Sequence, residues 1–362
     1  MSFVTILTNR TPFPATHCLL PDGEGGELVL VVVKASFVVG SDGEPALAEA
    51  PASLRLVDEF RGDPKLGIPR WDSDLAVFKP RVDVLIEAQA HAPLGRPTEQ
   101  VFVELHVGDP RGDPGEIQLS KSLLVTGDRV WDGDQPSPPL PFLTMPLGWE
   151  RAYGGTRSRE QVDERNPLGI GHQGARSVDP KVRSELPNIE NPEAPSTPAG
   201  LGVVARAWLP RRTLAGTYDD RWKRRRWPLA PRDFDPAFNQ SAPVDQQLQN
   251  YVGGESVRLV NLTPEGEWWF RLPKLDLPVH LIYEDRLDRA PLRIDTIEIE
   301  AELRRVVLTG RATIAIEPRR GRLEEIVLGH VAPAWLEAKR AGKRHVDLRG
   351  HDGADPRRAL WS

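Results

Sequence analysis

Acidic residues that could act as paired catalytic carboxylates gather in one long stretch of the chain. They are Asp128, Glu150, Asp163, Asp219, Asp233 and Asp235. Two carboxylates at a fixed separation can serve as general acid and base in glycoside hydrolysis. Sequence gives no separation, however, and Arg151, Arg165 and Arg221 lie close to three of these acids. Ion pairs and caps that satisfy the backbone of an irregular loop are therefore the favoured interpretation, and a carbohydrate-active hydrolase is the alternative.

The same interpretation extends to other polar residues of this stretch. A long ordered loop makes few regular backbone hydrogen bonds, so side chains must supply the missing partners. We predict that such a loop-organising set consists of Asp128, Arg129, Glu150, Arg151, Arg165, Asn166, Asn188, Glu190, Asp219, Asp233 and Asp235.

Other kinds of chemical site have little support in the sequence. No close pair with metal-ligand spacing is formed by His172, His280, His330, His345 and His351. Cys18 is the single cysteine, and no serine lies in a Gly-x-Ser-x-Gly elbow. The glycines at 169, 171 and 174 fall short of a dinucleotide-binding fingerprint. We therefore expect no catalytic residue, no metal, no cofactor and no enzymatic activity.

A basic and aromatic section is the candidate protein-binding surface. Its predicted contact residues are Arg211, Arg212, Arg221, Trp222, Arg224, Arg225, Arg226 and Trp227. Arginine interleaved with tryptophan can dock an acidic protein or stack nucleic-acid bases, and it can also form an internal cation–π or salt-bridge cluster. A structural or solvated face is the most common outcome for such a run, protein docking comes second, and nucleic acid is the weakest of the three.

These candidates all lie within or beside a segment, residues 131–255, that shows almost no helical or strand periodicity. The segment is rich in Trp, Tyr, Phe, Arg, Asn, Gly and Pro. Ordinary loops are much shorter, and disordered segments are poor in aromatic residues. We therefore predict an ordered, irregular surface that carries the function.

Antiparallel β-structure is predicted on both sides of this segment. Before it, the expected strands are 28–39, 81–90, 100–107 and 117–130, where apolar and polar residues alternate or β-branched residues are dense. After it, the expected strands are 257–262, 268–272, 279–283, 292–301 and 304–317, and the turn Pro264-Glu265-Gly266 predicts a hairpin between the first two. The best helix candidate is 323–342, with Pro333 expected to kink or divide it.

We therefore expect a mainly β protein whose sandwich-like antiparallel sheets form two lobes joined by a long ordered segment. The predicted parts are an N-terminal β lobe at 1–130, the irregular segment at 131–255, a C-terminal β lobe at 256–318, and a helix with a polar tail at 319–362. Sequence alone does not say whether the lobes share one sheet system. With 35 proline and 31 glycine residues but only 2 methionines, the composition argues against a helical bundle.

Charge and targeting signals bear on the classes of partner and on the cellular compartment. A net charge of −5 gives no general attraction to nucleic acid or to an anionic membrane. The first ten residues lack the basic start and apolar run of a signal peptide, and a single cysteine fits a reducing compartment. A cytoplasmic protein is the expected class.

The order of short motifs resembles that of a bacterial family, number 2169 among the domains of unknown function. Residues 145–147 read Met-Pro-Leu, and the match continues through 150–155, 165–169, 187–190, 198–202, 208–211, 215–222, 233–235 and 242–246. Flanking agreement comes from 9–13, 33–37, 79–84, 127–131 and 253–255. The resemblance covers residues 1–317.

This resemblance implies a cellular context and partner proteins, but no chemical reaction. Members of the family are commonly encoded in type VI secretion clusters, beside the spike protein, the spike-tip protein and a toxic effector, and some act as adaptors that bring the effector to the spike. The resemblance supplies no catalytic residue. It implies an effector and a spike or spike-tip protein as partners. From the net charge we expect no membrane partner, and we rank nucleic acid last among the possible partners. The pentapeptide repeats of some relatives are missing from this sequence.

Overall fold

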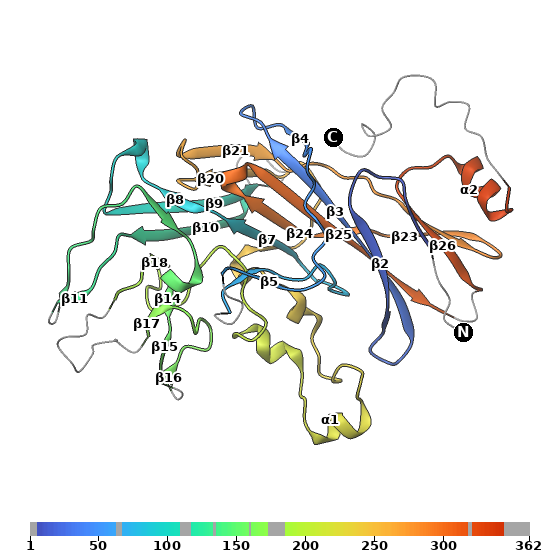
Figure 1. Ribbon diagram of the computed structural model, residues 1–362, viewed down its shortest axis with the longest axis horizontal. Coiled ribbons are helices and arrows are strands. Elements are labelled where there is room, and N and C mark those ends of the chain that lie inside the picture. The colour runs from blue at the N-terminus through green and yellow to red at the C-terminus, as the bar shows by residue number, and fades with distance from the viewer. Residues whose placement is uncertain are drawn as a thin grey trace.

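The computed structural model describes residues 6–62, 67–108, 117–132, 135–158, 161–172, 185–317 and 321–343. Most of its regular structure is strand, and most strand pairs are antiparallel. The expected mainly β class is confirmed. Three sheets follow one another along the long axis in Figure 1, with β9 and β10 at the left, β24 and β25 in the centre, and β23 and β26 at the right.

The central sheet has seven strands and combines strands from the N-terminal and C-terminal parts of the sequence. Its order is β19, β7, β24, β25, β3, β2, with β4 paired to the end of β3. The bounds are β2 (Ala15–Pro21), β3 (Glu27–Val39), β4 (Pro45–Leu47), β7 (Val82–Glu87), β19 (Gln247–Leu248), β24 (Arg293–Glu300) and β25 (Arg305–Ile316). β25 lies antiparallel to β3, and β24 lies parallel to β7, so strands from 1–130 and from 256–318 pair within one sheet.

A five-stranded sheet combines the same two ranges. Its order is β18 (Ile189–Glu190), β10 (Ile117–Thr126), β9 (Gln100–Gly108), β20 (Ser256–Val260) and β21 (Glu267–Arg271). The predicted hairpin is present, because β20 and β21 pair across the 264–266 turn. The two strand-rich parts of the sequence are thus one sheet system, and β18 brings in part of the middle segment as well.

One apolar core lies against both of these sheets. Alternating residues of β9, such as Val103 and Leu105, are buried in the same cluster as Ile297 of β24 and Leu308 of β25. Strands with an apolar face must cover it, and burial of that face is the main driving force for the assembly. Trp149 and Trp208 of the middle segment join the cluster and pack edge to face.

The third sheet has four strands, and it corrects the helix prediction. Its order is β1 (Ile6–Asn9), β26 (Leu323–Leu328), β22 (Val279–Tyr283) and β23 (Leu287–Ala290). A helix over 323–342 is wrong for its first part, because Leu323–Leu328 pairs with both β1 and β22. The helix α2 spans only Pro333–Arg340, and Pro333 starts it at the position where a missing N–H costs nothing.

The remaining elements are short. Two-stranded pairs are β5 (Glu59–Phe60) with β6 (Pro69–Trp71), β8 (Gln89–His91) with β13 (Thr144–Pro146), β11 (Trp131–Asp132) with β12 (Gln135–Pro136), β14 (Tyr153–Gly154) with β17 (Ile170–Gly171), and β15 (Thr156–Ser158) with β16 (Gln161–Val162). Short 3₁₀ turns are Pro93–Gly95, Trp149–Arg151, Arg211–Ala215, Pro236–Asn239, Val244–Gln246 and Ala301–Leu303. The part of the predicted polar tail beyond residue 343 lies outside the described residues.

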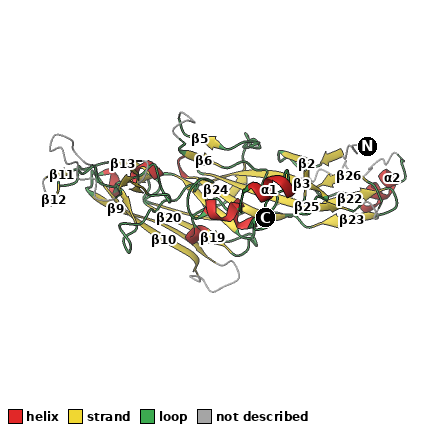
Figure 2. Ribbon diagram, turned by 90° about the horizontal axis from the view of Figure 1, so that it is seen from below, coloured by secondary structure: helices red, strands yellow, loops and turns green. Residues whose placement is uncertain are grey.

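The middle segment also carries helix α1 (Asp220–Arg225). It projects from the lower side of the molecule in Figure 1, and Figure 2, viewed from that side, shows it in front of the central strands. Among the helices in the described ranges, none is both long and apolar enough to cross a bilayer.

Candidate protein-binding surface

The middle segment is held in shape by asparagine and arginine side chains. The Asn166 amide donates to the carbonyls of Trp149 and Tyr153, at 2.8 and 3.0 Å. The Asn188 amide donates to the Thr126 carbonyl at 3.0 Å and to Asp128 at the same distance. Both asparagines are buried. Each amide therefore supplies hydrogen bonds to backbone that no regular element satisfies.

Ion pairs continue the same arrangement. Arg151 bonds both Asn188, at 3.0 Å, and Asp128, at 3.3 Å. Arg129 pairs with Glu190 at 2.9 Å and also donates to the Pro187 carbonyl. These contacts tie the chain near residue 128 to the chain near 190, although the two lie about 60 positions apart.

Most of the acids considered for catalysis are already engaged. Asp163 accepts from the Arg165 backbone N–H and from its guanidinium, with the shortest contact at 2.7 Å. Burial opposes ionisation of Asp163, but the hydrogen bonds from Arg165 outweigh it and hold the pKa below its usual range. Asp219 caps α1 through the Trp222 N–H, and Asp235 caps the next 3₁₀ turn through the Ala237 N–H.

The last two acids behave differently from one another. Asp233 accepts from the hydroxyl and the N–H of Thr217, and these bonds lower the pKa of its carboxyl. Glu150 folds back over Gly148, and its Oε2 is buried without a hydrogen-bond partner in the described part of the chain. Its neighbour Arg151 turns to Asp128 instead, because adjacent residues on a 3₁₀ turn point in different directions.

The predicted contact residues divide into buried and exposed groups. Arg211 is buried, and its guanidinium donates to the carbonyls of Val204 and Phe238 and pairs with Asp72 at 2.7 Å. Arg211 is therefore a structural side chain that anchors the start of residues 211–239, the part of the middle segment that carries α1 and that we call the excursion. Arg212, next to it, is exposed and pairs with Glu164 at 2.8 Å.

Arg226 and Trp222 also hold the excursion together. The Arg226 guanidinium donates to the carbonyls of Ala230 and Gly23, which joins the excursion to the β2–β3 hairpin. The Trp222 indole N–H donates to the Leu229 carbonyl at 2.9 Å, and its ring packs edge to face on Tyr218. Trp222 therefore holds α1 against neighbouring parts of the excursion, and Arg226 fixes the excursion against the β2–β3 hairpin.

The exposed group lies on and just after α1. Arg221, Lys223, Arg224 and Arg225 are exposed, and within the described ranges none of them has an ion-pair partner. Trp227 follows them with 68% of its surface exposed. Arginine and tryptophan are enriched at protein contact surfaces.

A groove runs between this excursion and the body of the protein. It has a volume of about 680 Å³. It is bounded by the β2–β3 turn at 21–28, by residues 56–58 and 73–77 of the segment that we call the covering loop (55–62 and 67–77), and by the excursion at 228–239. Leu28, Leu75, Val77 and Leu229 give it apolar walls. We call this feature the α1 groove.

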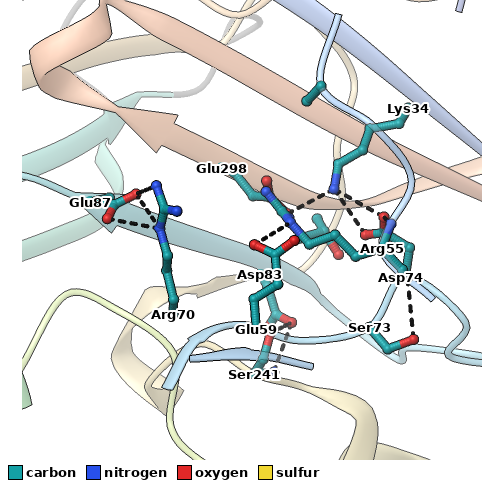
Figure 3. Close-up of polar contacts among 12 residues, drawn as sticks. Lys34, Arg55, Glu59, Arg70, Ser73, Asp74, Asp83, Glu87, Ser241 and Glu298 are labelled. Carbon is teal, nitrogen blue, oxygen red and sulfur yellow. Dashed lines mark hydrogen bonds and ion pairs between the residues drawn. The ribbon is translucent and has the colours of Figure 1, made fainter. Parts of the chain in front are cut away.

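Buried charges fix the covering loop that forms one wall of the groove. Directly paired positions place Lys34, Thr309, Thr296 and Asp83 in one row across β3, β25, β24 and β7. Lys34 reaches Asp74 of the covering loop at 3.0 Å and Glu298 at 3.5 Å, as Figure 3 shows. Sequence reasoning missed this network, and the polar residues at 34 and 36 inside an apolar strand were its only signal.

Further contacts complete the network. Arg55 of the covering loop reaches the same Glu298 at 2.6 Å. Asp83 accepts from Lys79 at 2.7 Å, from the Gln240 amide, and from the Ser241 and Ala242 N–H groups. Both the covering loop and the end of the middle segment are thereby attached to the polar face of the sheet. No group of three or more His, Cys, Asp or Glu side chains in the ranges described could hold a metal ion.

Comparison with known proteins gives one match. A family model described as an uncharacterized protein conserved in bacteria (DUF2169) matches residues 24–311. No curated protein and no solved structure matches the chain.

Proposed function

The chain belongs to the DUF2169 family of bacterial proteins, and from that premise we propose that it is a non-catalytic adaptor or chaperone. It binds a type VI secretion effector and helps to load it onto the spike complex through a spike or spike-tip protein. We expect loading to occur in the cytoplasm, before secretion. The type VI setting is what the family resemblance implies, whereas the recognition role is argued from the residues below.

The observation that carries the proposal is the unpaired basic surface of α1. Arg221, Lys223, Arg224 and Arg225 extend into solvent beside Trp227, while Arg211, Trp222 and Arg226 hold the excursion in place. A helix whose backbone is already held in place is suited to protein recognition, because that backbone does not have to be ordered on binding. Unpaired charges also speed the approach of an acidic partner.

The hydrolase alternative has weaker support. A glycosidase needs two available carboxylates about 5–10 Å apart, one to protonate the leaving group and one to attack or activate water. Among the acids considered, Asp128, Asp163, Asp219, Asp233 and Asp235 are bonded to arginine or to backbone N–H groups. Of these six acids, only Glu150 has a buried oxygen without a hydrogen-bond partner in the described ranges. One such acid without a partner acid favours an adaptor over a hydrolase.

A secretion assay tests the proposal. The gene is deleted in the native host, and the neighbouring effector is quantified in the culture supernatant and in the cells. We expect secretion of that effector to be lost while the spike protein itself is still exported, and the wild-type gene to restore it. Normal effector secretion in the deletion strain would overturn the adaptor role.

A further inference from the structure

We propose that the α1 groove binds an amphipathic segment of the partner protein, with large apolar side chains along one side and acidic side chains along the other. This inference rests on the proposed adaptor function and names the chemistry of the segment that is recognised. Three features of the groove support it: its apolar walls, the exposed apolar residues at its rim, and the sign of the charge on its α1 side.

The walls are suited to apolar side chains. Leu28 and Leu75 come from the central sheet and the covering loop, and Pro228, Leu229 and Phe234 come from the excursion. The volume of about 680 Å³ falls within the size range of protein ligand sites, about 300–1,000 Å³. Elements from three parts of the chain form these walls, and Arg226 joins two of them through its bond to Gly23. The groove is therefore a preformed feature of the fold.

The rim exposes large apolar side chains in one place. Leu56 is 62% exposed and Val57 is 72% exposed, and both line the groove. Trp227 precedes Pro228 of the opposite wall. Covering apolar surface contributes about 25 cal/mol per Å², so a partner that covers these residues gains free energy at both rims. Clustered exposure of this kind marks interaction sites.

The charge beside the α1 groove indicates which side chains we expect along the second side of the bound segment. Helix α1 carries four cations and one acid, Asp220, apart from its capping residue. At the rim, Asp58 pairs with Arg206 and Glu24 pairs with Arg226, whereas Asp22 keeps its negative charge because its carboxylate accepts from the neutral Glu24 and Gly26 N–H groups. On the α1 side of the groove, four cations exceed the two acids Asp219 and Asp220, so the charge there is positive and an acidic segment complements it.

Two other occupants fit less well. The C-terminal residues 344–362 contain more arginine than aspartate, so they do not complement α1. A nucleic acid would meet apolar walls at Leu28, Leu75, Val77 and Leu229, which offer its phosphates no contacts. A protein segment satisfies both the charge and the apolar walls.

The inference is tested by selection and mutation. A library of random peptides displayed on phage is selected on the purified full chain, and one enriched peptide is labelled and titrated by fluorescence polarisation. We expect enriched sequences to combine Asp or Glu with Leu, Phe or Trp. Replacing the acids of the labelled peptide by lysine should weaken binding at least about tenfold, the equivalent of about 1.4 kcal/mol.

Groove variants locate the binding site. The double variant Leu56→Asp with Val57→Asp should weaken binding of the labelled peptide at least about tenfold. Leu94→Asp, at a residue that is 89% exposed and outside the groove, is the matched control and should bind normally. All three residues are exposed, so circular dichroism melts should match those of the wild type.

Specific results overturn the inference. Enriched peptides without acids, equal binding by the groove double variant, or displacement of the peptide by a single-stranded oligonucleotide would each do so. Failure of the adaptor function is a separate outcome. Peptide binding in the groove together with normal effector secretion in the deletion strain would overturn the adaptor role alone, and effector capture that is unchanged in the groove variant would overturn the groove assignment alone.

Discussion

Lys34 of β3 and Asp74 of the covering loop form an ion pair at 3.0 Å, with side chains that are 0% and 4% exposed. The pair crosses from the central sheet to one wall of the α1 groove. Glu298 and Arg55 extend it, so a sheet face that would ordinarily be apolar is joined to its covering segment by charges. Such an arrangement contributes to positioning more than to net stability, since two desolvated charges offset much of their attraction.

Removing one partner of this network should be strongly destabilising. Lys34→Met removes the cation that pairs with buried Asp74 and leaves Arg55 as the partner of Glu298. Breaking a buried pair typically costs about 3–5 kcal/mol. Urea denaturation measures the change in the free energy of unfolding. The control is Arg340→Met, which removes an exposed pair with Glu337 and should cost no more than about 1 kcal/mol. Equal stability of the two variants would contradict this account of the network.

Asp83 should make stability depend on pH in the acid range. Burial alone would raise its pKa, but Lys79 and the surrounding donors outweigh burial and hold the pKa below the usual value. The unfolded state therefore binds a proton first, so this contribution is complete above about pH 4 and is lost as pH falls through the folded pKa. Urea midpoints measured from pH 7 to pH 3 should fall at the acid end.

The variant Asp83→Asn isolates that contribution. Its amide nitrogen would point a donor at either the Ser241 or the Ala242 N–H group, because these bond to different oxygens of Asp83, so the variant should be less stable than the wild type at pH 7. The difference between the two proteins should shrink as pH falls. A difference that stays constant down to pH 3 would show that Asp83 is not the titrating group.

Asn188 should prove essential for the shape of the middle segment. Asn188→Ala removes the donor to the Thr126 carbonyl and the acceptor of Arg151, and an unsatisfied buried group costs about 1–3 kcal/mol. Hydrogen exchange should become faster around residues 126–130 and 151–153. Asn250→Ala, at an exposed asparagine, should stay within about 0.5 kcal/mol of the wild type. Unchanged exchange in Asn188→Ala would rule out the loop-organising role.

The strands could be predicted from local patterns, whereas their partners could not. Val101, Val103 and Leu105 alternate with polar residues, and β9 lies where that period places it. Leu323–Leu328 was mistaken for helix, because its apolar residues fit both periods and its pairing with β1 is set by a strand more than 300 residues away. Pairing over such distances in sequence is a tertiary property.

Prediction from sequence is limited in the same way for the basic and aromatic section. Arg211 and Arg224 belong to one basic run, yet the first is buried against Val204 and Asp72 and the second is exposed. Composition marked the section as a contact candidate, but only its packing separates anchor from contact residues. Lys34 gave a weaker signal still, because its partners lie 40 and 264 positions away.

Because Arg211 is buried and Arg212 is exposed, substitutions at these two neighbouring arginines should have different effects on stability. Arg211→Met leaves the Val204 and Phe238 carbonyls without this donor and leaves Asp72 with Arg206 as its arginine partner, so it should lower the free energy of unfolding by about 2–5 kcal/mol. Arg212→Met removes only an exposed pair and should cost about 0–1 kcal/mol. Thermal or urea denaturation distinguishes them. If both variants were as stable as the wild type, Arg211 would not be the anchor of the excursion.

The most direct measurement is quantitative capture from the native host. The tagged chain is purified from lysate as wild type, as the variant Arg221→Glu, Arg224→Glu, Arg225→Glu, and as the charge-matched control Arg96→Glu, Lys274→Glu, Arg289→Glu, whose residues are exposed elsewhere. Mass spectrometry then quantifies the type VI effector and the spike or spike-tip protein. We predict that wild type and control capture both and that the α1 variant loses the effector with an unchanged melting temperature. Capture of neither protein by the wild type, or equal capture by all three, would contradict recognition through α1.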